Sequence, residues 1–476
     1  MLKYTGHPFI DVGVATIVAM ADKGSPEEVT EEDLQNVTAT MEKWFSSASK
    51  FRDFLSSIYP NSQFTQPAFN KPKYASKKAE YASTVLRSYQ HAHSQGEELC
   101  AFCGDPAVYT ASRAQVPLLN GQTIINFSPK GKPGLPVCGY CLLAAHALPF
   151  GTLKSEGRLL VVHTDDPEWT FLFARKGWHY NLPKLQMMDQ GGITDWPNHS
   201  HPKTKLVHLL CKILSDAQRG QRRQPHPLRS LVAYHFTNYG PRPAISIYEL
   251  PSAALSFIRE AEHPGAACHE AWKYYIDRAW VQPKAQKGEE AEVESTEKEI
   301  GRNTLYEDLF SLPDTAGRFL ARHLVPSARR VEAWLALPEG NWSLIELFFR
   351  KVMHMNTQRI EAIRLLGDRL AAYVQHRDRR LFNDLHFARN YGAIRLALIR
   401  AARDGWSPDS EALIPMDVFA RVFEEGNDDL ADLSWRLARD VLMIRMCEQL
   451  HQAGWFEHNR DMIESIQQAE SEEETE

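Results

Sequence analysis

The chain contains four cysteines arranged as two Cys-x-x-Cys pairs, Cys100 with Cys103 and Cys138 with Cys141. Each pair can direct two thiolates at one ion while backbone amides donate to the sulfurs, and two pairs complete a closed tetrahedral site typical of zinc. Such a site has no open coordination position, so we expect a structural Zn²⁺. The 34 residues between the pairs exceed the spacing of a simple zinc ribbon, which predicts a hairpin extending from the site. A redox-active Cys-x-x-Cys needs one pair in a thioredoxin-like βαβ context, which does not fit.

Positive charge is concentrated between His201 and Pro243, where eight basic residues accompany the single acid Asp216. The eight are Lys203, Lys205, Lys212, Arg219, Arg222, Arg223, Arg229 and Arg242. Basic side chains bind phosphates, amides can pair with base edges, and aromatic rings stack on or wedge between bases. A basic loop alone is more typical of a solvated surface. The neighbouring Asn238-Tyr239-Gly240 favours nucleic acid, because it places a base-reading amide on a sharp turn beside the charges.

Motifs for catalysis are largely missing from the sequence. It contains no phosphate-binding Gly-x-x-x-x-Gly-Lys-Ser/Thr loop, no Gly-x-Ser-x-Gly elbow and no His-Glu-x-x-His helix. His163, Asp165 and Asp166 could ligate a metal, but isolated acids and histidines more often serve turns and helix caps. We therefore expect a binding protein with no catalytic residues.

Composition indicates a soluble globular protein of two or three domains, with 476 residues, 24% of them charged, and a net charge of −6. The acids are concentrated in residues 287–299 and 461–476, so the rest of the chain is slightly basic. The longest apolar runs are far shorter than the ~20 residues that cross a bilayer, and the N-terminus does not resemble a signal peptide. We expect a cytoplasmic protein, and the odd count of seven cysteines fits a reducing compartment.

The expected fold class is α+β, with a mixed N-terminal domain, a zinc-ribbon-like lobe and an all-α C-terminal helical bundle. The N-terminal domain is expected over 1–285, with the four-cysteine zinc lobe at about 95–145 and the basic, DNA-facing loop at about 201–243. Residues 286–300 form an acidic linker, and 301–476 form the bundle with an acidic tail.

Capping residues and periodicity locate the expected elements. Helices are expected from an N-cap at Asp11 to Gly24, over 30–58 and over 75–93. A hairpin is expected over 116–119 and 123–127 around Asn120-Gly121, and strands over 158–163, 170–174, 231–236 and 244–250.

Four features together resemble a known family: Tyr4-Thr5-Gly6-His7-Pro8 with Asp11-Val12-Gly13, the paired Cys-x-x-Cys motifs, Phe236-Thr-Asn-Tyr-Gly240, and the helical C-terminus. They resemble the large subunit of the type I-B CRISPR Cascade, in its CXXC-CXXC branch, over essentially the whole chain. The Cys pairs alone are generic, and their order relative to the other motifs is more specific.

The resemblance implies a subunit of a crRNA-guided surveillance complex in antiviral defence that is not itself a nuclease. Such a subunit recognises the protospacer-adjacent motif (PAM) in double-stranded DNA, promotes strand separation and R-loop formation, and helps hold the displaced strand. The implied partners are crRNA, the crRNA-binding backbone subunits, target DNA, and a helicase-nuclease or transposition machinery.

Within that resemblance we assign roles to the residues of the basic region. Asn238 is expected to read a base edge, with Tyr239 or Gly240 in the minor groove. The expected phosphate ligands are Arg219, Arg222, Arg223, Arg229, Arg242, Lys203 and Lys205.

Met353 and Met355 precede an all-helical stretch with the size of a free-standing bundle. Relatives of this system make their small subunit from an internal start in the large-subunit gene, so we expect a separate product that begins near here; the alternative is that both are ordinary methionines. Two other function classes remain open. One is a zinc-ribbon nucleic-acid-binding scaffold in transcription or RNA processing, and the less favoured one is a metal-dependent nuclease that uses His163, Asp165 and Asp166.

Overall fold

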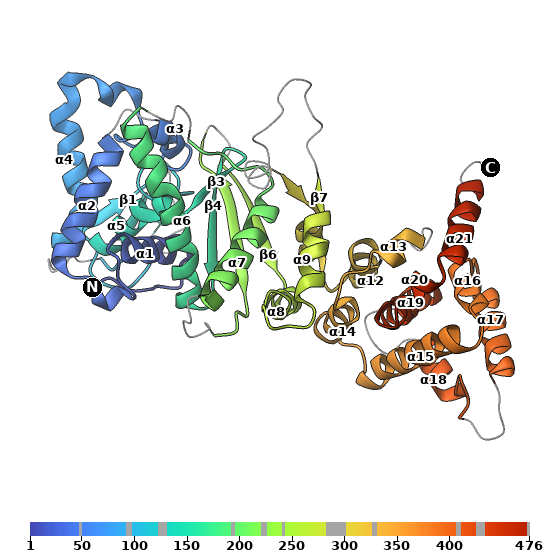
Figure 1. The fold of residues 1–476 in the computed structure, drawn as a ribbon. Helices are drawn as coiled ribbons and strands as arrows, with labels where there is room; N and C mark the ends of the chain where they lie inside the picture. The colour runs from blue at the N-terminus through green and yellow to red at the C-terminus, as the bar shows by residue number, and fades with distance from the viewer. Residues whose placement is uncertain are drawn as a thin grey trace. The chain divides into compact units, whose positions relative to one another are not determined.

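The computed structural model describes residues 1–46, 50–91, 98–121, 131–191, 196–219, 226–239, 243–281, 301–325, 331–405, 411–424 and 434–473 (Figure 1). By contacts, the chain divides into two compact units. The first is Met1–Leu250 with Gln282–Arg302, and the second joins Pro251–Val281 to Asn303–Glu476. The first unit mixes helices with antiparallel sheets and the second is mostly helical, which confirms the predicted α+β class with a helical C-terminal region.

A buried helix, α1 (Pro8–Met20), lies at the centre of the first unit. Pro8 suits the first helical turn, and the apolar residues that follow are buried on every side. Helix α5 (Gly139–Ala147) packs against α1 at Gly13, where an added Cβ would lie 2.0 Å from the Ala144 carbonyl oxygen. Gly13 therefore sets how closely the two helices approach.

The main sheet has four antiparallel strands in the order β3-β4-β5-β6. They are β3 (Leu153–Ser155), β4 (Arg158–Thr164), β5 (Leu231–Thr237) and β6 (Ala244–Leu250). Val161, Tyr234 and Ile247 lie opposite one another across three of the strands. Helices α6 (Pro167–Asp189) and α7 (Pro202–Arg219) connect β4 to β5 and lie alongside the sheet (Figure 1). The strands predicted over 158–163, 231–236 and 244–250 are confirmed.

The strand predicted over 170–174 is wrong, because these residues lie inside α6. The Asp166 carboxylate accepts a hydrogen bond from the Glu168 amide at 2.8 Å, and Pro167 occupies the first helical position. This N-cap starts a helix whose apolar residues face the core. The apolar residues of this run therefore follow the helical repeat and not the two-residue alternation of a strand.

Other elements of the first unit differ in extent from the prediction. The helix predicted over 30–58 is described as α2 (Glu31–Ser46) and α3 (Lys50–Ser56), with 47–49 outside the described residues, and the basic helix α4 (Ala75–Leu86) ends before the predicted residue 93. Strands β1 (Tyr109–Ala111) and β2 (Leu135–Val137) pair outside the predicted hairpin, whose 123–127 arm lies outside the described residues. Short helical turns are η1 (Pro26–Glu28), η2 (Pro67–Asn70), η3 (Pro72–Tyr74), η4 (Ser88–His91) and η5 (Leu148–Gly151).

The second unit begins earlier than the predicted boundary at residue 285. Helices α8 (Ser252–Ala261) and α9 (His269–Arg278) pack on α14 (Asn341–Lys351). Phe257 contacts Phe348 edge to face at 5.4 Å, and the Tyr275 hydroxyl donates to Asn341 Oδ1 at 2.7 Å. The boundary at residue 285, which was inferred from composition, is therefore wrong. A change in charge along the sequence does not show which unit the helices before it pack against. The predicted linker, 286–300, itself lies outside the described residues.

The remaining elements follow in chain order. They are β7 (Trp280–Val281), β8 (Arg302–Asn303), α11 (Thr304–Asp308), η6 (Leu309–Ser311), α12 (Ala316–Phe319), the π-helical turn η7 (Leu320–Leu324), α13 (Val331–Leu335), α15 (Thr357–His376), α16 (Arg380–His386), α17 (Tyr391–Asp404), α18 (Met416–Phe423), α19 (Trp435–Gln452), α20 (Trp455–His458) and α21 (Arg460–Glu473). Helix α15 packs against both α18 and α19, which forms the core of the bundle. In the described part of the chain, every helix is too short or too polar to cross a membrane.

Candidate metal centre and nucleic-acid interface

The four cysteine sulfurs of the two Cys-x-x-Cys pairs meet in one place. All four sulfur atoms lie within 4.8 Å of one another, and Cys103 Sγ is 3.5 Å from Cys138 Sγ. In a tetrahedral site with metal–sulfur bonds of about 2.3 Å, the sulfurs are separated by about 3.8 Å. Cys100, Cys138 and Cys141 are buried, and Cys103 is half-buried. These four residues can hold a metal ion.

Local backbone geometry builds each half of this site. Gly104 adopts a φ of +77°, which lets the chain turn back so that its amide donates to the Cys100 carbonyl oxygen at 3.0 Å. Cys138 is the N-cap of α5, and its sulfur accepts from the Cys141 amide at 3.4 Å. The Ala101 amide donates to the Pro136 carbonyl at 2.9 Å and so ties the two halves together.

The electrostatics of the cysteine group also fit a divalent metal ion. Hydrogen bonding within the group, first with Cys138, lowers the pKa of Cys100. The same bond raises the pKa of Cys138 to about 12, and the bond to Cys100 raises that of Cys141. Without a cation the cluster therefore favours one thiolate held by neighbouring thiols, whereas a divalent ion would compensate several negative charges at once.

The N-terminal motif surrounds a buried carboxylate. Asp11 accepts hydrogen bonds from the backbone amides of Thr5 at 2.6 Å and Gly6 at 3.0 Å, and His163 Nε2 lies 3.4 Å from Asp11 Oδ2. Asp11 was expected at the N-cap of the first helix, but α1 begins at Pro8 and Asp11 lies in its first turn. Asp11 therefore fixes the preceding loop to α1 and to β4.

The residues of the nuclease alternative have separate local roles. Asp165 Oδ1 accepts from the Ser230 amide at 3.1 Å, Asp166 caps α6, and His163 faces Asp11. Within the described ranges, only the four cysteines gather three or more potential metal-ligand atoms within 4.8 Å. The geometry thus does not bring these residues together as a metal site.

The structure buries Asn238, the expected base reader. The residue is 0% exposed, its Nδ2 donates to the Ile58 carbonyl at 3.2 Å, and its backbone amide donates to the Ser57 carbonyl at 2.6 Å. A base-reading amide must be exposed, so the structure contradicts the role expected of Asn238. The next residue, Tyr239, is 67% exposed, and Gly240 lies outside the described residues. Asn238 anchors a turn whose exposed side chain is Tyr239.

The expected phosphate ligands do not form one cluster. Arg229 is exposed two residues before β5 begins, whereas Tyr239 lies two residues after it ends, and the strand alone, at about 3.3 Å per residue, separates its two ends by roughly 20 Å. Helix α7, with Lys203 and Lys205 in its first turn, begins near the Tyr239 end of the sheet. There the Glu156 carboxylate between β3 and β4 accepts from the His201 amide at 3.3 Å. The Arg219 side chain, Arg222, Arg223 and Arg242 lie outside the described residues.

One basic residue and one aromatic residue near Lys205 were not among the predicted site residues. Lys184 Nζ lies 4.5 Å and Lys205 Nζ lies 5.4 Å from the centroid of the Tyr180 ring. Tyr180 and Lys184 are four residues apart on α6, the spacing that places side chains next to each other on a helix. This spacing can be read from the sequence, but it has meaning only on a helix, and a strand was predicted at 170–174.

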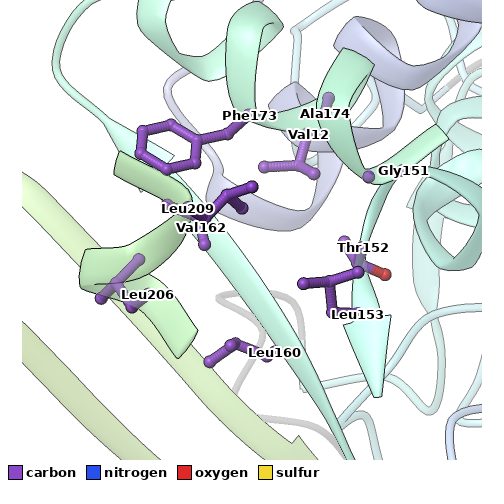
Figure 2. Close-up of a pocket in the computed structure, with 11 residues that line it drawn as sticks. Val12, Gly151, Thr152, Leu153, Leu160, Val162, Phe173, Ala174, Leu206 and Leu209 are labelled. Atoms are coloured by element: carbon purple, nitrogen blue, oxygen red, sulfur yellow. The ribbon is translucent and has the colours of Figure 1, made fainter. Parts of the chain in front are cut away.

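The first unit also contains a small, partly open space among β3, β4, α6 and α7 (Figure 2). Its volume is about 10 Å³, room for about one water molecule. Figure 2 shows apolar side chains such as Leu160, Phe173 and Leu206 around it, and the Thr152 hydroxyl already donates to the Leu148 carbonyl at 3.0 Å. This space is a packing defect and not a ligand site.

Comparison of the chain with family models, with curated proteins and with solved structures found no significant match. The functional assignment therefore depends on the residues and on their geometry.

Proposed function

We propose that the chain is the large subunit of a crRNA-guided type I-B Cascade complex, a binding subunit and not an enzyme. In this role it recognises the PAM in double-stranded DNA and promotes strand separation and R-loop formation. It then helps hold the displaced strand so that a helicase-nuclease or a transposition machinery can be recruited. The crRNA and the crRNA-binding backbone subunits are its partners, and pairing with the guide supplies sequence specificity.

The observation that carries this proposal is the exposed turn after β5. Tyr239 is 67% exposed beyond the end of the strand, while the Asn238 beside it is anchored to Ser57 and Ile58. A projecting ring next to a residue anchored by hydrogen bonds suits insertion into a minor groove, where aromatic or apolar side chains can wedge between base steps and start to open the duplex. In this proposal Tyr239 is the minor-groove residue, and Asn238 anchors it instead of reading a base edge.

Basic residues near this turn supply the sequence-independent part of binding. Lys203 and Lys205 lie in the first turn of α7, near the end of the sheet that carries Tyr239. Lysines that neutralise phosphates release counterions, which gives affinity for any sequence and places the protein on the duplex. Arg229, at the opposite end of β5, is a separate phosphate contact in this proposal.

We propose that Zn²⁺ is the ion held by Cys100, Cys103, Cys138 and Cys141. A closed site of four thiolates suits zinc and leaves no position for a substrate, so its role is structural. Zinc would supply charge compensation for the thiolates and hold the two turns together. The chain's own residues then keep the lobe in place against α1, through Val14 and the packing of α5.

One alternative keeps the same metal site and basic residues without a guide RNA, namely a scaffold in transcription or RNA processing. The two functions differ in their partners. In the first, the chain purified from its native host co-purifies with a short guide RNA and the crRNA-binding subunits; in the second it co-purifies with transcription or RNA-processing proteins and lacks the guide. Absence of guide RNA from the native complex would overturn the Cascade proposal.

The nuclease alternative is tested with the isolated chain. Cleavage of DNA in Mg²⁺ or Mn²⁺ that disappears in the Asp165→Ala variant would favour it over the Cascade proposal. Because Asp165 accepts from the Ser230 backbone amide and Asp166 caps α6, we expect no cleavage by either form.

A further inference from the structure

The second unit contains a cleft that the proposed function does not use. The cleft lies among α9, the start of α11, the η7 turn and α13, and its volume is about 580 Å³. The residues that line it all belong to the second unit, so the cleft is a feature of that unit alone. Small organic ligands bind in clefts of about 300–1,000 Å³, so this one has the volume of a ligand site.

One side of the cleft carries a cation that an aromatic side chain positions. Arg278 is exposed at the end of α9, where its Nη1 donates to the Tyr274 hydroxyl at 2.5 Å. Its guanidinium carbon lies 5.3 Å from the centroid of the same ring, as expected for residues four apart on a helix. In the described part of the chain Arg278 forms no ion pair. The phenol is neutral, so the guanidinium keeps its charge.

The second arginine of the cleft is already neutralised. Arg322 Nη1 and His323 Nε2 both lie 2.8 Å from Asp308 Oδ2. Burial lowers the pKa of His323, so its ring is neutral at pH 7 and donates to the carboxylate, and Arg322 balances the charge of Asp308. Among the described lining residues, Arg278 is therefore the cation that can pair with an anionic ligand.

The cleft also presents an acid that is not used by these cations. Glu332 is exposed on α13, and its Oε1 accepts from Gln467 Nε2 at 2.9 Å. A carboxylate has further acceptor positions, so Glu332 can accept from a ligand as well. Glu332 and Arg278 line the same cleft but form no ion pair with each other within the described ranges. The cleft therefore suits a ligand with an anionic group and a separate hydrogen-bond donor.

Much of the remaining lining is apolar and small. Ala279 follows α9, Val325 follows the η7 turn, and Ala336 and Leu337 come from the end of α13. Such residues leave room for a flat ring and give it an apolar surface. The Tyr274 ring adds an aromatic face, on which planar groups such as nucleobases stack.

We propose that this cleft binds a nucleoside monophosphate. The phosphate pairs with Arg278, the base stacks against Tyr274, and an exocyclic amino group of the base donates to Glu332. A free amino acid also carries an anionic group and a donor, but it would fill little of a cleft of this volume. A free nucleotide and a nucleotide within a single strand share this chemistry.

The test is binding of deoxynucleoside monophosphates to the full chain, measured by isothermal titration calorimetry. We expect one dAMP per chain. Deoxyadenosine lacks the phosphate and inorganic phosphate lacks the base, so each should bind about fivefold or more weakly than dAMP. In a competition arm, single-stranded (dA)6 displaces dAMP if the cleft takes a nucleotide of a strand, and leaves it bound if the cleft takes the free nucleotide.

The first variant tests the phosphate contact. Arg278→Ala should weaken dAMP binding about tenfold or more, because it removes a charge-assisted hydrogen bond, and should leave deoxyadenosine binding unchanged. Arg318→Ala is the matched control, because Arg318 is an exposed arginine of α12 that does not line the cleft. Both side chains are exposed, so we expect both variants to keep the wild-type melting temperature.

The second variant tests the base contact. Adenine has an exocyclic amino group and thymine has none, so the wild type should prefer dAMP to dTMP. Glu332→Ala removes the acceptor, and we expect that preference to disappear whatever the change in overall affinity.

The results separate this site from the proposed function. Failure of dAMP to bind the wild-type chain would overturn the site, as would equal losses of dAMP and deoxyadenosine binding in Arg278→Ala. An unchanged preference for dAMP over dTMP in Glu332→Ala would overturn the assignment of the base contact. Neither result bears on the proposed function, because the DNA contacts assigned there, Tyr239, Lys203, Lys205 and Arg229, belong to the first unit.

Discussion

The guanidinium of Arg113 donates a hydrogen bond from Nη2 to the backbone carbonyl oxygen of Asn238 at 3.0 Å. Arg113 lies between the two Cys pairs in the sequence, and Asn238 is the residue that precedes the exposed Tyr239. The bond therefore joins the segment that the metal would organise to the turn that we propose contacts DNA. Order at the metal site and order at the turn are expected to depend on each other.

Removal of the metal tests this dependence. We expect one Zn²⁺ per chain, and we expect a chelator or Cys138→Ser to unfold the zinc lobe, because such a site contributes on the order of 10 kcal/mol. Hydrogen exchange at residues 237–239 should then become faster. Metal analysis and exchange measurements check both effects, and Cys447→Ala, which changes a buried cysteine of α19, is the matched control that should keep its zinc. Zinc loss with unchanged exchange at the turn would contradict the dependence.

The buried position of Asn238 changes what its substitution should do. Asn238→Ala removes the hydrogen bond to the Ile58 carbonyl and leaves that acceptor without its donor, so we expect a loss of about 1 kcal/mol in the free energy of unfolding. DNA binding should weaken for all flanking sequences alike. Urea unfolding and binding to a library of flanking sequences measure the two effects. A change in which motif is preferred, with stability unchanged, would show instead that Asn238 reads a base.

His146 predicts a pH dependence of stability. The ring is fully buried and stacks on Tyr59 at 5.1 Å, and burial lowers its pKa to about 4. Between about pH 6.5 and pH 4 the unfolded chain binds a proton at this residue that the folded chain does not, so the unfolding free energy falls as pH falls. The full effect is about 3 kcal/mol, at about 1.4 kcal/mol per pKa unit.

The measurement is the difference in pH slope between wild type and His146→Phe. Other buried histidines contribute equally to both proteins, so the difference isolates His146. We expect the variant to lose less stability between pH 6.5 and pH 4, whatever its stability at pH 7. Parallel slopes for the two proteins would contradict the assignment.

A separate C-terminal product that begins at Met353 or Met355 remains a prediction of the sequence. Such a product would start between α14 and α15, and it would keep the packing of α15 on α18 and α19. We expect mass spectrometry of the purified complex to find this second chain. A Met353→Leu/Met355→Leu double variant should abolish it, while Met416→Leu on α18 should not. A complex that contains only the full-length chain would contradict the prediction.

The parts of the fold that the sequence predicted are those set by local patterns. The metal site follows from the spacing within each Cys pair, and β4, β5 and β6 follow from strand-like runs of β-forming residues. The expected strand at 170–174 failed, because its apolar residues suit either structure and the Asp166 cap decided for a helix. The Asp166-Pro167 start of this helix is readable in the sequence and predicts the helix correctly.

Other features depend on contacts between distant residues. Asn238 is buried because Ser57 and Ile58, about 180 residues earlier, accept its hydrogen bonds. Helices α8 and α9 belong to the second unit because Phe257 packs on Phe348, and no local pattern records that pairing. The basic residues of 201–243 do not form one cluster, because Arg229 and Tyr239 lie beyond opposite ends of the strand β5.

The central claim is that this chain lets a guided complex open DNA next to a short motif. The most direct measurement is strand opening on a library of flanking sequences, by a complex reconstituted from crRNA, the backbone subunits and this chain. We predict strand opening only beside a restricted set of motifs. Tyr239→Ala should decrease the extent of strand opening about tenfold or more, as loss of a wedge worth a few kcal/mol implies, and Tyr239→Phe should open DNA like the wild type. Equal opening beside every flanking sequence, or opening that does not require this chain, would contradict it.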